Sequence, residues 1–98
     1  MKHRNNVMIL SEILECCTIE ATYEDIRKNV HISSGVITKH LNFLLSKGLL
    51  FKIIYRRVGK KRVRDGYTLL DSKKGREFLN GCREFKTFYK QYLHEDVL

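Results

Sequence analysis

The stretch that decides the fold is residues 33–50, which read SSGVITKHLNFLLSKGLL. Its aliphatic residues recur at helical spacing and fall on one face of a helix; they are Ile37, Leu41, Leu44 and Leu45. Ser33 or Ser34 precedes this run as an N-cap, and Gly48 follows it where a left-handed residue favours the end of a helix. The sequence therefore predicts a helix over about residues 34–47.

Two shorter helical segments precede this one. From about Asn6 to Cys17, apolar residues recur every three or four positions, which predicts an amphipathic first helix. Thr22 is followed three residues later by Asp25, an arrangement typical of a helix N-terminus, so we expect a second helix over roughly residues 23–30. His31-Ile32 then forms the turn, which gives the order helix, helix, turn, helix.

After these helices the pattern changes from helical to extended. Residues 49–58 and 63–70 are rich in β-branched and aromatic side chains, and a loop containing Gly59-Lys60 separates them. The pattern predicts a β-hairpin, and two positions compete for its turn. Asp65-Gly66 is chemically the better two-residue turn, but a tip within 58–62 gives strands of matched length. We place the tip within 58–62 and a bulge near Asp65-Gly66.

From Asp71 or Ser72 onward, apolar residues again follow a helical period. Spacings of four, three, four and three residues form a heptad seam of Phe78, Cys82, Phe85, Tyr89 and Tyr92. Such a helix, of about 22 residues and roughly 33 Å, is longer than a core of this size can cover. We expect its distal half to pair with a second copy of the chain, although a plain amphipathic helix packed on its own domain would show the same pattern.

Positive charge is concentrated in the predicted hairpin and the start of the last helix. The chain has 19 Lys and Arg against 11 Asp and Glu, a net charge of +8. Residues 49–76 hold ten basic and two acidic residues, whereas 1–48 and 77–98 are nearly neutral. The basic hairpin residues are Lys52, Arg56, Arg57, Lys60, Lys61, Arg62 and Arg64. Clustered Lys and Arg indicate a polyanion such as nucleic acid as the binding partner, because neutralising its phosphates releases the counterions condensed on it. A solvated charged hairpin and an anionic membrane surface are the alternatives.

The order of elements is that of a winged helix-turn-helix domain followed by a long dimerisation helix. The fold class is therefore mainly α with a β-hairpin wing, with a DNA-binding domain over residues 1–71 and a C-terminal coiled-coil helix over 72–98. In such a domain the second helix of the pair enters the major groove and the wing, here residues 52–64, lies on the backbone or minor groove. The candidate contacts of helix 34–47 are short polar groups and one cation: Ser33, Ser34, Thr38, Lys39 and Asn42. For each residue taken singly, ordinary solvent-facing polarity is the alternative.

Four motifs of this sequence resemble those of a known family. They are the run from Ile9-Leu10 to Cys17, LLSKGLL at 44–50, Tyr67-Thr68-Leu69 and SKKGREFL at 72–79. Over about residues 4–93 the chain resembles the small archaeal winged-helix DNA-binding proteins. The resemblance implies C-terminal helices that pair as an antiparallel coiled coil to make a homodimer. The wing of this chain is longer and more basic than the short loop usual in that family.

These observations favour a homodimeric DNA-binding transcription regulator whose partner is double-stranded DNA. The alternatives are an architectural, chromatin-like protein that coats DNA with little specificity, and a winged-helix module that docks an acidic protein partner. An enzyme is the least expected class, because no catalytic set falls on elements that could converge and no Gly-rich phosphate loop follows a strand.

We expect no metal and no cofactor. Cys16, Cys17 and Cys82 form no CxxC pair, and the four histidines are scattered without metal-ligand spacing. No stretch approaches about 18 consecutive apolar residues, and the first residues do not form a signal peptide. The expected location is the cytoplasm, on the nucleoid or in a host cell if the protein is viral.

Overall fold

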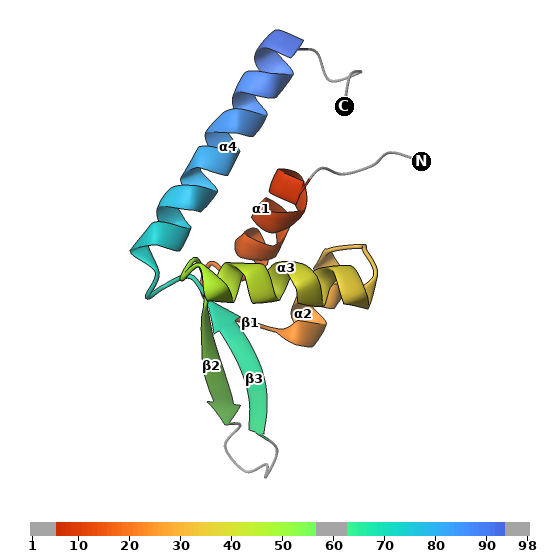
Figure 1. Ribbon diagram of the computed structural model, residues 1–98, viewed down its shortest axis with the longest axis vertical. Helices are drawn as coiled ribbons and strands as arrows, with labels where there is room; N and C mark the ends of the chain where they lie inside the picture. Colours follow the sequence, from red (N-terminus) through yellow and green to blue (C-terminus); the bar gives the residue numbers. More distant parts are fainter. Residues whose placement is uncertain (1–5, 57–62, 94–98) are drawn as a thin grey trace.

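The computed structural model describes residues 6–56 and 63–93 (Figure 1). Its elements are α1 (Asn6–Cys16), β1 (Ala21–Thr22), α2 (Tyr23–Asn29), α3 (Ser34–Ser46), β2 (Phe51–Arg56), β3 (Val63–Thr68) and α4 (Lys73–Leu93). In Figure 1 α1, α2 and α3 form the centre, while the β2–β3 hairpin and α4 extend from it in opposite directions. The predicted order of four helices and a hairpin is confirmed, and the short strand β1 is added to it.

The hydrophobic core lies between the first three helices and the base of the hairpin. The largest fully buried apolar side chains come from α1, α2, α3 and the segments flanking the hairpin; they are Ile13, Leu14, Ile26, Ile37, Leu44, Leu50 and Leu69. Among the described side chains, α4 joins this core in its first turns, where Leu79 is buried and Phe78 packs against the cluster. α3 and the first turns of α4 therefore pack against the same hydrophobic core.

The sheet has three antiparallel strands in the order β1-β3-β2. β2 and β3 pair without interruption from Phe51↔Thr68 to Arg56↔Val63. The predicted bulge near Asp65-Gly66 is therefore wrong, and so is the alternative turn at that position. Gly66 instead lies in the middle strand, where β1 pairs with it from the other side, so an extra residue there would disrupt two ladders at once. The predicted tip within 58–62 lies outside the described residues.

Local capping chemistry explains where the helices begin. Thr22 Oγ1 accepts the backbone N–H of Asp25 at 3.2 Å and the Thr22 N–H donates to Asp25 Oδ2 at 3.0 Å, so the capping box predicted for α2 is present. Ser33, and not Ser34, caps α3 by accepting the N–H of Val36. Gly48 has a φ of 70°, as predicted for the residue that ends α3.

Three helix ends differ from their predicted positions by one residue. α1 ends at Cys16, α2 at Asn29 and α3 at Ser46. In α2 the next residue, Val30, is extended and buried, so it leaves the helix to fill the core. These shifts do not change which elements form or which faces they bury.

Candidate nucleic-acid interface

α3 has one buried and one exposed face. Its inward side chains include Ile37, Leu41 and Leu44, as predicted, and Leu45 packs against the core. The predicted contact residues all lie in exposed positions; they are Ser33, Ser34, Thr38, Lys39 and Asn42. The exposed face therefore presents hydroxyl groups, an amide and one ammonium group along the first two turns and a half of the helix.

His40 also belongs to the buried face of α3, although it was not among the predicted inward residues. Its imidazole is buried, and Nδ1 lies 2.8 Å from the carbonyl oxygen of Val36, one turn earlier in the helix. The signal was present in the spacing, because His40 follows Ile37 by three residues and precedes Leu44 by four. This histidine is therefore a hydrogen-bonded core residue of the helix and not part of its exposed face.

The first turn of α3 is fixed by α2. The Tyr23 hydroxyl donates to the carbonyl oxygen of Ser34 at 3.2 Å, and the ring of Tyr23 packs against the core. Together with the Ser33 cap, this contact holds the N-terminal end of α3, where the exposed polar residues begin. Only a long-range contact reveals this role of Tyr23, so no local pattern could have found it.

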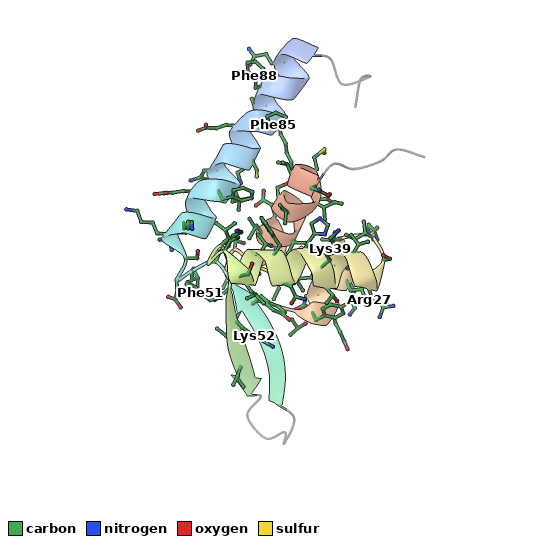
Figure 2. All side chains as sticks on the ribbon, in the orientation of Figure 1. Arg27, Lys39, Phe51, Lys52, Phe85 and Phe88 are labelled. Carbon is green, nitrogen blue, oxygen red and sulfur yellow. The ribbon has the colours of Figure 1, made fainter. Side chains whose placement is uncertain are left out.

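Two further cations lie close to the turn between α2 and α3. Arg27 and Lys28 occupy the last turn of α2 and are exposed. Figure 2 shows Arg27 beside the end of α3 that lies nearest the turn, and Lys39 farther along α3. Their position at a helix C-terminus also favours the helix dipole. The charge count by segment missed them because Glu24 and Asp25 at the start of the same helix cancel their charge.

The hairpin begins at the C-terminal end of α3, and the structure describes its base (Figure 1). Lys52 is exposed in β2, and its register partner is Tyr67 in β3. Arg56 and Arg64 lie on the paired strands, and the structure describes their backbone. Arg57, Lys60, Lys61 and Arg62 lie outside the described residues. α3 ends at Ser46 and β2 begins at Phe51, so a connection of four residues joins the helix to the basic hairpin.

The seam of α4 divides into two parts. Phe78 packs against the core and Cys82 is only 4% exposed, so the proximal part is covered within the same chain. Phe85 is 45% and Phe88 55% exposed, and Figure 2 shows both on the part of α4 that extends beyond α1. The side chains of Tyr89 and Tyr92 lie outside the described residues. Among the seam side chains that the structure describes, Phe85 is therefore the first that is largely exposed.

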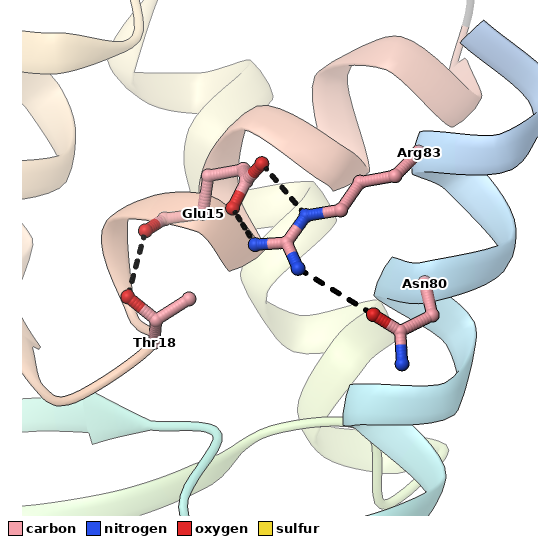
Figure 3. A network of polar contacts seen from close by, with 4 residues as sticks. All are labelled: Glu15, Thr18, Asn80 and Arg83. Carbon is pink, nitrogen blue, oxygen red and sulfur yellow. Dashed lines mark hydrogen bonds and ion pairs between the residues drawn. The ribbon is translucent and has the colours of Figure 1, made fainter. Parts of the chain in front are cut away.

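A polar contact marks the boundary between these two parts (Figure 3). Arg83 in α4 donates from Nε to Glu15 Oε2 in α1 at 3.1 Å and from Nη2 to the other carboxylate oxygen. Arg83 Nη1 also lies 3.4 Å from Asn80 Oδ1. The hydrogen bond from Arg83 lowers the pKa of Glu15 below its ordinary value. The pair therefore ties α4 to α1 at its midpoint.

The three cysteines are free thiols placed by packing. Cys17 and Cys82 are buried and Cys16 is half-buried. Burial raises the pKa of all three, that of Cys17 to about 12, so their thiols stay protonated at neutral pH. Among residues 6–56 and 63–93, no three His, Cys, Asp or Glu residues gather into a possible metal site. No helix in those ranges is long and apolar enough to span a membrane.

The comparisons with known proteins agree on one fold. A family model described as winged helix-turn-helix matches residues 3–90. The reduced form of the transcriptional regulator YodB from B. subtilis superposes with a TM-score of 0.67 at 18% identity, over 92% of this chain and 81% of that one. Diamide-treated YodB gives 0.66 at 16% identity, over 91% and 82%.

A third solved structure is a PadR family transcription regulator from Clostridium difficile. It gives a TM-score of 0.61 at 21% identity, over 90% of this chain and 96% of that one. No curated protein matches the sequence. At these identities the similarity to the solved structures is one of fold.

Proposed function

The chain belongs to the winged helix-turn-helix family, and from this premise we propose that it is a homodimeric DNA-binding transcription regulator. In this proposal α3 enters the major groove, and the basic wing, residues 52–64, lies on the backbone or in the minor groove. The protein acts by binding and not by catalysis.

The observation that carries the proposal is the exposed face of α3 beside a basic hairpin. The major groove admits one helix and displays a distinct donor and acceptor pattern for each base pair. Thr38 offers a hydroxyl and a methyl group, Lys39 a cation for guanine or phosphate, and Asn42 an amide that can pair with adenine through two hydrogen bonds. All three side chains are exposed on one helix whose opposite face is buried, so α3 can enter a groove without losing core contacts.

The charge distribution supports the role of the wing. Residues 49–76 contain ten basic and two acidic residues, and the hairpin begins within a few residues of the end of α3. A cation cluster next to a groove-binding helix gives both affinity for phosphates and a fixed orientation on the duplex. Arg27 and Lys28 at the end of α2 add two exposed cations near the N-terminal end of α3 (Figure 2).

The dimer rests on the distal part of α4. Two phenylalanines, Phe85 and Phe88, are about half exposed there, and a second copy of the same face would cover both sets at once. We propose antiparallel pairing, in which the Tyr92 end of one helix lies near the Phe78 end of the other and Phe85 lies near the crossing. The recognition helices would then meet successive major grooves about 34–36 Å apart, or a multiple of that distance.

The fold shared with YodB and the PadR family protein supports the regulatory part of the proposal, because both are described as transcription regulators. The test is selection of binding sites from genomic DNA, followed by competition with bulk DNA at two salt concentrations. A regulator should bind its best site about 10³-fold or more tightly than bulk DNA, and the site should be two-fold symmetric.

Other results lead to other functions. Equal affinity for all sequences with a steep salt dependence would indicate the architectural protein. No DNA binding at physiological salt would overturn the proposal and favour a protein-interaction module. Sedimentation showing a monomer at micromolar concentration would remove the dimer from the proposal and leave DNA binding to be judged separately.

A further inference from the structure

α4 begins directly on the segment that ends α3. Ser72, which is 2% exposed, precedes the first residue of α4. Its hydroxyl donates to the carbonyl oxygen of Gly48 at 2.7 Å and accepts the backbone N–H of Gly75 at 2.9 Å. One hydroxyl group therefore caps α4 and joins it to the residue at which α3 turns into the hairpin.

The contact between the two segments is made by backbone atoms. A Cβ atom added at Gly75 would lie 1.9 Å from the carbonyl oxygen of Leu49 and 2.7 Å from Cδ2 of Leu69. The first turn of α4 thus touches the main chain just after α3, with no side chain of Gly75 between them. Long side chains can adjust to small rotations, but directly packed backbones resist them. The junction of Gly48, Ser72 and Gly75 should therefore be stiff.

The direction of α4 matters because the helix acts as a lever. From Gly75 to Tyr92 it rises about 26 Å at 1.5 Å per residue. A rotation of about 10° at the base would move the far end by roughly 4–5 Å, more than the 3.4 Å or so between successive base pairs. The Arg83–Glu15 pair gives the helix a second fixed point on α1, and the junction is the fixed point nearest to α3.

We propose that the hydroxyl of Ser72, held between Gly48 and Gly75, is a positioning element that sets which spacing of DNA half-sites the dimer accepts. The inference rests on the proposed function. Ser72 contacts no DNA in this scheme. It acts by fixing the angle between α3, which enters the groove, and α4, which joins the two copies.

Three substitutions at Ser72 separate its two hydrogen bonds. Ser72→Ala removes both bonds. Ser72→Asp keeps an acceptor for the N–H of Gly75 but has no donor for the Gly48 carbonyl, whereas Ser72→Thr keeps donor and acceptor. The matched control is Ser11→Ala, another buried serine, whose hydroxyl donates to the Met8 carbonyl within its own helix.

The first measurement is affinity for one half-site and for two-fold sites whose spacing is changed by one base pair in either direction. The unmodified protein should prefer one spacing by about tenfold or more. Ser72→Ala and Ser72→Asp should reduce that preference to about threefold or less while half-site affinity changes by less than about twofold. Ser72→Thr and Ser11→Ala should retain the preference of the unmodified protein.

The second measurement needs no DNA. Residual dipolar couplings of backbone amides report the relative orientation of α3 and α4, and in the unmodified protein one alignment tensor should fit both helices. In Ser72→Ala the couplings of α4 should become smaller or require a separate orientation. If this variant does not fold, the comparison between Ser72→Asp and Ser72→Thr decides the question in the same way.

Several results would overturn the inference. They are an unchanged spacing preference in Ser72→Ala, equal losses on half-sites and full sites, or unchanged couplings in α4. A dimer that binds its operator with no spacing preference would overturn this inference and leave the proposed function intact. Failure to bind any half-site better than bulk DNA would overturn the proposed function itself, and this inference with it.

Discussion

The two halves of α4 carry one continuous heptad pattern but lie in different surroundings. From Gly75 to Arg83 the helix packs on its own chain, with Leu79 and Cys82 buried and Arg83 paired with Glu15. Phe85 and Phe88 follow on the same helix and are about half exposed. A periodic pattern thus identifies the face that is buried somewhere, but it does not say whether the same chain or a second copy covers it.

The largest expected effects lie in the proximal half, and the first of them is at Gly75. Gly75→Ala should destabilise the fold by about 3 kcal/mol, because the new methyl group would overlap the Leu49 carbonyl and the backbone must move. The free energy of unfolding in urea measures the loss.

The matched control is Gly81→Ala, six residues further along the same helix, where an added Cβ meets nothing within 4 Å. This change should stabilise the protein by about 0.5–1 kcal/mol through helix propensity. Similar effects at Gly75 and Gly81 would show that the first turn of α4 is not packed on the backbone after α3.

The next effect contrasts burial within the chain and burial between chains. Changing Phe85 and Phe88 together to Glu should weaken the dimer by about 100-fold or more, because like charges would face their symmetry mates. The helices should remain folded, and sedimentation equilibrium with circular dichroism measures both properties.

Leu79→Ala should do the reverse. It should lower the free energy of unfolding by about 2–5 kcal/mol and leave the dimer interface in place. Thr87→Glu is the charge control, because it lies about 200° around the helix from Phe85. A double Glu variant that remains a dimer would show that the distal half is not the interface.

Much of the fold could be predicted because it depends on local chemistry. The capping box of Thr22 and Asp25, the Ser33 cap and the left-handed Gly48 each need only neighbouring residues. The buried face of α3 follows in the same way from a spacing of three and four residues. These features set the order of elements, and that order was enough to recognise a winged helix-turn-helix domain.

The features that could not be predicted depend on contacts far apart in the sequence. β1 has two residues and no period of its own, yet its pairing with Gly66 excludes the predicted bulge. In the sequence Ser72 is an ordinary N-cap residue. Its neighbours in the sequence do not indicate that its hydroxyl also donates to the carbonyl oxygen of Gly48. The heptad seam was predicted, but its division at Arg83 depends on how far α1 extends along α4 in the folded chain.

The third effect tests whether α3 and the distal half of α4 act on DNA in different ways. Asn42→Ala should cost about 1–3 kcal/mol of binding at the preferred half-site, with a smaller loss on bulk DNA, because it removes a base contact. The Phe85 and Phe88 double variant should keep half-site affinity and lose most of its affinity for the two-fold site. Titrations of both variants on half-sites and full sites measure the contrast, and equal losses on specific and bulk DNA would assign Asn42 to the backbone or to folding.

The smallest effect concerns the pair at the boundary between the two halves. Arg83 lowers the pKa of Glu15 below its ordinary value of 4.5, so the folded state holds this carboxylate ionised at a pH where the unfolded chain begins to protonate it. The contribution of the pair is therefore complete above about pH 4.5 and is lost as the pH falls through the lowered pKa. Glu15→Gln should reduce stability slightly at pH 7, much less than Gly75→Ala does, since both partners are exposed and salt screens them. Urea unfolding at pH 7 and at pH 3 measures the difference, which should shrink at the lower pH and in high salt.

The control is Glu84→Gln, which removes an equal charge from the residue that follows Arg83 in the sequence. The same urea measurements on this variant should give no such difference between pH 7 and pH 3. If they do, net charge and not the contact between α1 and α4 accounts for the effect.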